Sequence, residues 1–115
     1  MGTWGTGIFD DDVALDVRDA FEDALSDGLD ISAATRRALE EFGSAAEDSD
    51  DGPIIYLALA ALQLQREALQ PEIREKVLHL IATGEGLGRW EDADPAALTD
   101  RKLVLETLKT KLAAE

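Results

Sequence analysis

The sequence predicts an all-α fold, in the form of a compact bundle of about five helices that spans residues 1–115 as a single domain. Three observations carry this prediction. Apolar residues recur at helical spacing, glycines and prolines divide the chain at helix-length intervals, and few stretches alternate β-branched with polar residues. The chain has 115 residues and no cysteine, so we expect a buried apolar core, without disulfides or thiolate zinc sites, to hold it together.

The first predicted helix covers about residues 13–26 and follows an N-terminal arm, residues 1–12. Asp10 or Asp11 would cap its start, and Gly28 stands just past its end, where glycine is the preferred residue. Apolar residues at helical spacing define one buried face of this helix, namely Ala14, Val17, Phe21, Ala24 and Leu25.

The second predicted helix covers about residues 32–42 and ends at Gly43, after which an acidic loop covers residues 43–52. Pro53 then opens the third helix at the first helical position, where the missing N–H of proline costs nothing. Residues 54–64 are apolar nearly all round the helix, which is typical of a helix at the centre of a bundle.

Pro71 opens the fourth predicted helix in the same way, and Gly84 ends it. Its inward residues would be Ile73, Val77, Leu80 and Ile81. A glycine-rich link over 84–94 leads to Pro95 and the last helix. One face of that helix carries Leu98, Leu105, Leu108 and Leu112.

The net charge of −14 is unevenly distributed along the chain. Residues 1–51 hold 15 acidic residues and 3 arginines, whereas residues 52–115 hold 10 acidic and 8 basic residues. Nucleic acids and anionic lipids require basic surfaces, so we expect no direct nucleic-acid binding and no membrane binding. A basic protein partner is compatible with this charge, although acidity can also serve solubility alone.

The stretch WGTGIFDDD, residues 4–12, is the most distinctive part of the sequence. A phosphate-binding loop is excluded, since no strand precedes it, no lysine follows it, and three aspartates occupy the place of the phosphate. We interpret the stretch as an anchored helix entry, in which aromatic rings pack on the body, glycines permit tight turns and the first aspartate caps the helix. The residues with these roles are Trp4, Gly5, Gly7, Phe9 and Asp10.

An alternative interpretation makes Asp10, Asp12 and Asp16 oxygen ligands of a divalent cation, because Asp12 and Asp16 share one face of a helix. The acidic loop does not match the calcium-loop pattern, since its closing glutamate position falls on Ala58. We therefore expect no cofactor and no metal, with the three aspartates as the alternative.

Aspartates recur along the first predicted helix at spacings of four, three, four and four residues. They form an acidic stripe of Asp12, Asp16, Asp19, Asp23 and Asp27. Each pair of like charges at this spacing is destabilising by a few tenths of a kcal/mol. We expect Arg18 to offset part of this cost through an ion pair with Glu22. The stripe is either a solvated helix face or a docking face for a basic surface.

The N-terminal residues resemble those of a family of bacterial proteins known as domain of unknown function 4259. The family's signature falls here on Gly2, Trp4, Gly5, Gly7, Phe9, Asp10, Asp11, Asp12, Ala14 and Asp16, and the strings LALAALQ and GRWED are similar as well. The first 16 residues are the specific part of the resemblance. It implies a bacterial, cytoplasmic protein and supplies no mechanism.

The sequence favours a non-enzymatic interaction domain, similar to inhibitors or immunity proteins, that binds a basic protein partner. His79 is the only histidine, and no nucleophile motif accompanies it. The alternatives are a small metal-dependent hydrolase built on the Asp10–Asp16 cluster and a nucleic-acid mimic. The longest apolar run, residues 54–62, is shorter than the ~20 residues of a membrane span, and no signal peptide is visible, so we expect a cytoplasmic protein. The sequence does not predict an oligomeric state.

Overall fold

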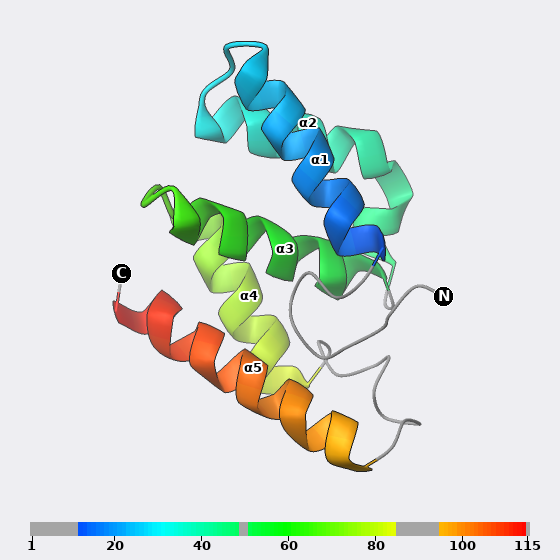
Figure 1. Cartoon of the computed structure of the whole chain (residues 1–115), viewed down its shortest axis with the longest axis vertical. Coiled ribbons are helices and arrows are strands. Elements are labelled where there is room, and N and C mark those ends of the chain that lie inside the picture. The colour runs from blue at the N-terminus through cyan, green and yellow to red at the C-terminus, as the bar shows by residue number, and fades with distance from the viewer. Residues whose placement is uncertain (1–11, 49–50, 85–94, 115) are drawn as a thin grey trace.

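The computed structural model describes residues 12–48, 51–84 and 95–114, and these residues form five α-helices and one short 3₁₀ helix (Figure 1). The helices are α1 (Asp12–Ser26), α2 (Ile31–Phe42), η1 (Gly43–Glu47), α3 (Asp51–Gln65), α4 (Pro71–Thr83) and α5 (Pro95–Ala114). No strand occurs within the described ranges. The predicted all-α fold with five helices is confirmed.

The first two helices form an antiparallel hairpin joined by a short turn. Gly28 has a φ of 92°, a left-handed conformation that glycine adopts without steric cost, and the N–H of Leu29 bonds back to the carbonyl of Ala24. Asp30 then caps α2, because its Oδ1 accepts a hydrogen bond from the N–H of Ala33 at 2.8 Å. This cap places the start of α2 at Ile31, one residue before the predicted start.

Helix α3 crosses the middle of the molecule, with α1 and α2 on one side and α4 and α5 on the other (Figure 1). Ten of its 15 residues are buried, and they lie on all sides of the helix: Gly52, Pro53, Ile54, Ile55, Leu57, Ala58, Leu59, Ala60, Leu62 and Gln63. The prediction of an apolar central helix is confirmed. A helix that is apolar all round must be covered on every side, and this determines where the other helices pack.

The segment 43–52 differs from the predicted acidic loop. Its first five residues form η1, and α3 begins at Asp51, so that Pro53 lies inside the first turn and not at its first position. The Oδ1 of Asp48 accepts a hydrogen bond from the N–H of Asp51, and its carbonyl accepts one from Gly52. The first N–H groups of a helix have no partner inside the helix, which is why proline is tolerated here.

Replacing Gly52 with alanine is expected to lower the free energy of unfolding by about 1–3 kcal/mol, the usual cost of overpacking. A Cβ at this residue would lie 2.6 Å from the carbonyl oxygen of Ala46, a backbone atom that cannot rotate away. Urea denaturation would measure the change. Gly84→Ala serves for comparison: a Cβ there meets nothing within 4 Å, so any loss of stability in that variant reports the unfavourable φ of 80° without overpacking. Unchanged stability of Gly52→Ala would contradict the close approach of η1 to α3.

Helices α4 and α5 pack against each other below α3. As predicted, α4 begins at Pro71 and ends just before Gly84, which has a φ of 80° and donates its N–H to the last turn of the helix. The Nε of Arg74 donates a 3.0 Å hydrogen bond to the carbonyl of Leu112 and so ties α4 to the end of α5. The buried residues of α5 are Arg101, Leu105, Leu108 and Leu112, while Leu98 is half-buried. Within the described ranges, no helix combines the length and apolarity needed to cross a membrane.

The predicted N-terminal arm, residues 1–12, lies outside the described residues except for Asp12. The glycine-rich link over 84–94 lies outside them except for Gly84. The structural roles of Trp4, Gly5, Gly7, Phe9 and Asp10 are therefore still predictions. The caps proposed for α1 at Asp10 or Asp11 are also outside the described part.

Candidate functional site

The acidic stripe lies on the exposed side of α1. Its five members are all exposed, namely Asp12, Asp16, Asp19, Asp23 and Asp27, the last lying just past the end of the helix. The opposite side of α1 is buried against α2 and α3 through Ala14, Val17, Ala20, Phe21 and Ala24. Helical periodicity thus separates the two sets of side chains, and the stripe faces solvent.

Two of the stripe residues have nearby cations. Asp27 accepts a 3.0 Å hydrogen bond from Arg37 of α2, and a guanidinium nitrogen of Arg18 lies 3.7 Å from Asp19. Both pairs are largely exposed, and such pairs contribute about 0–1 kcal/mol each because water screens them. The other three, Asp12, Asp16 and Asp23, have no ion pair with any residue that the structure describes.

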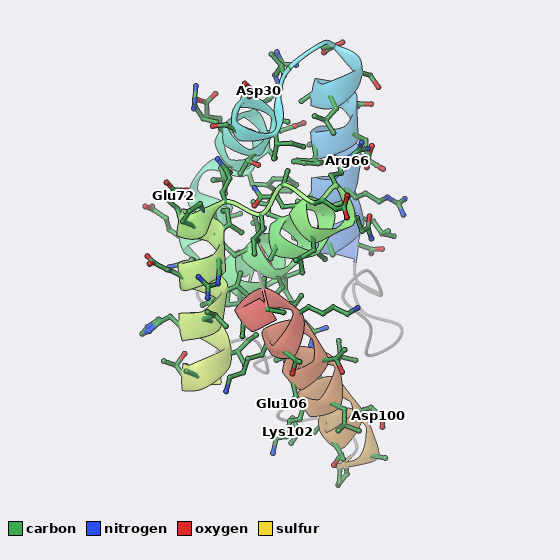
Figure 2. The ribbon with its side chains drawn as sticks, turned by 90° about the vertical axis from the view of Figure 1, so that its left-hand side faces the viewer. Asp30, Arg66, Glu72, Asp100, Lys102 and Glu106 are labelled. Atoms are coloured by element: carbon green, nitrogen blue, oxygen red, sulfur yellow. The ribbon has the colours of Figure 1, made fainter. Side chains whose placement is uncertain are left out.

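Glu22 does not pair with Arg18, contrary to the prediction. It accepts a hydrogen bond from Arg66, which directly follows α3 and lies beside α1 (Figure 2). Arg66 is 44 positions away in the sequence, so only the packing of α1 on α3 brings the two side chains together. The pair marks the border between the stripe side of α1 and the C-terminal end of α3.

A groove of about 800 Å³ lies between the C-terminal half of α3 and α5. Most of its lining side chains are apolar, and Leu103 is 62% exposed to solvent. The lining residues are Ala61, Leu64 and Gln65 of α3, Glu67 in the turn that follows it, and Leu103, Val104, Thr107, Leu108, Lys111 and Ala114 of α5. The sequence does not predict this groove, because it lies between two helices that are distant in the sequence and that α4 holds near each other.

A family model described as domain of unknown function, DUF4259, matches residues 2–115. The chain belongs to the DUF4259 family. The match covers nearly the whole chain, and the resemblance noted in the N-terminal residues is therefore confirmed. Comparisons with curated proteins and with solved structures gave no significant match.

This DUF4259 chain also contains a buried polar cluster that sequence analysis missed. Gln63 is fully buried in α3, and its Nε2 donates to the Oγ1 of Thr35 in α2 at 2.8 Å and to the Oε1 of Gln70 at 2.9 Å. The Oε1 of Gln63 accepts the backbone N–H of Gln70 at 2.9 Å. The one feature of the sequence that could have indicated this cluster is a glutamine within an apolar run. The cluster fixes α2 and the α3–α4 turn to the central helix.

Arg101 is a second buried polar residue that the sequence did not single out. It is 1% exposed and lies on the same face of α5 as Leu105, Leu108 and Leu112. A charged residue is usually assigned to the solvent face of a helix, and the periodicity of the three leucines was the signal that could have placed it inside.

The predicted metal site of this family member is described only in part. Asp12 and Asp16 lie one helical turn apart on the exposed side of α1, whereas Asp10 is outside the described residues. Among the residues that are described, no group of three potential ligands is positioned to hold a metal ion. His79 is exposed on α4. The Asp10, Asp12 and Asp16 alternative is still a prediction.

Proposed function

We propose that this chain is a non-enzymatic interaction domain whose acidic stripe binds a basic surface of a protein partner. The observation that carries the proposal is the set of stripe aspartates. All five are exposed, and Asp12, Asp16 and Asp23 have no ion pair with a described residue. Repulsion along the helix is a cost to the isolated protein, and a basic partner would remove it.

Such a surface acts mainly on the rate of association. A negative face attracts a positive one over distances comparable to the Debye length, so encounter is accelerated at low salt. Inhibitors of the immunity or antitoxin kind depend on this property, because they must reach their target before it acts. We place the chain in that class, in the bacterial cytoplasm.

The triple change Asp16→Asn, Asp19→Asn and Asp23→Asn is expected to leave the fold intact and slow association with the partner about tenfold or more at low salt. The partner is first isolated by affinity capture at low salt from cells that carry the gene, with release at high salt. Stopped-flow kinetics then compare the variants. Thermal melting should show equal or slightly higher stability, since the change removes like-charge repulsion.

The matched control removes three exposed carboxylates elsewhere, in Glu72→Gln, Glu75→Gln and Asp100→Asn. These residues belong to α4 and α5, and Figure 2 shows Glu72 and Asp100 well away from α1. Net charge changes equally in both triple variants. If the control slows association as much as the stripe variant does, net charge and not the stripe is responsible, and the proposal fails.

The same experiments distinguish the two alternative functions. A melting temperature that rises with micromolar magnesium or calcium, and no longer does so in the stripe variant, would favour the metal-dependent hydrolase. Capture of a DNA-binding protein that duplex DNA displaces competitively would favour the nucleic-acid mimic.

A further inference from the structure

We draw no further inference here: the strongest candidate, the apolar groove between α3 and α5 that Leu103 borders, carries nothing, because nothing in the structure shows what covers it.

Discussion

Leu59→Ala is expected to lower the free energy of unfolding by about 2–5 kcal/mol, the range found when a buried leucine is truncated. Leu59 is fully buried at the middle of α3, the helix on which α1, η1 and α4 pack. Removing its branched carbons leaves a cavity in the core, and the helices that pack on α3 are held in place by their other contacts with it, so the cavity does not close fully. Domains of this size are stable by about 5–15 kcal/mol, so the loss is a large fraction of the total.

Urea denaturation followed by circular dichroism measures this change, with Leu103→Ala as the matched control. Leu103 has the same side chain but is 62% exposed, so its truncation should alter stability by about 0.5 kcal/mol or less. Comparable losses in the two variants would mean that α3 is not the centre of the core.

The fold could be predicted because its strongest signals are local. Gly28, Gly84 and Pro71 mark helix ends through the φ angles that glycine and proline allow, and these boundaries lie where the pattern placed them. The burial of α3 follows from its composition, since a segment that is apolar on all sides can avoid water only at the centre of the bundle. The exposure of the stripe follows from the 3.6-residue period of α1 in the same way.

The remaining features depend on contacts between distant segments. Glu22 contacts Arg66 and not Arg18, and no spacing rule within one helix could indicate this. The groove depends on how α4, which packs on both α3 and α5, places these two helices relative to each other. Arg101 shows the limit of residue type as a guide, because its place on the helix, and not its charge, determines its burial. What the stripe binds depends on a second molecule, and no pattern in this chain names it.

Gln63→Leu is expected to destabilise the fold by about 2–4 kcal/mol, although leucine is more apolar and of similar size. Gln63 is fully buried and makes three hydrogen bonds, to the Oγ1 of Thr35, the Oε1 of Gln70 and the N–H of Gln70. The leucine would leave these groups without their partner at a buried residue, Thr35, and at a half-buried one, Gln70. Losing a buried partner costs about 1–3 kcal/mol for each group left unsatisfied, which exceeds the gain from a better apolar side chain.

A double-mutant cycle with Thr35→Val assigns this cost to the hydrogen bonds. Thr35 is 4% exposed, and valine fills the same volume without the hydroxyl, so the double variant removes both partners of one bond. We expect the double variant to be more stable than the sum of the two single changes predicts, by about 0.5–3 kcal/mol.

Gln65→Leu, two positions along the same helix and exposed, is the control and should change stability by about 0.5 kcal/mol or less. If Gln63→Leu is as stable as the wild type, the glutamine is not needed to hold α2 and the α3–α4 turn on the central helix, and the packing of apolar residues alone fixes the bundle.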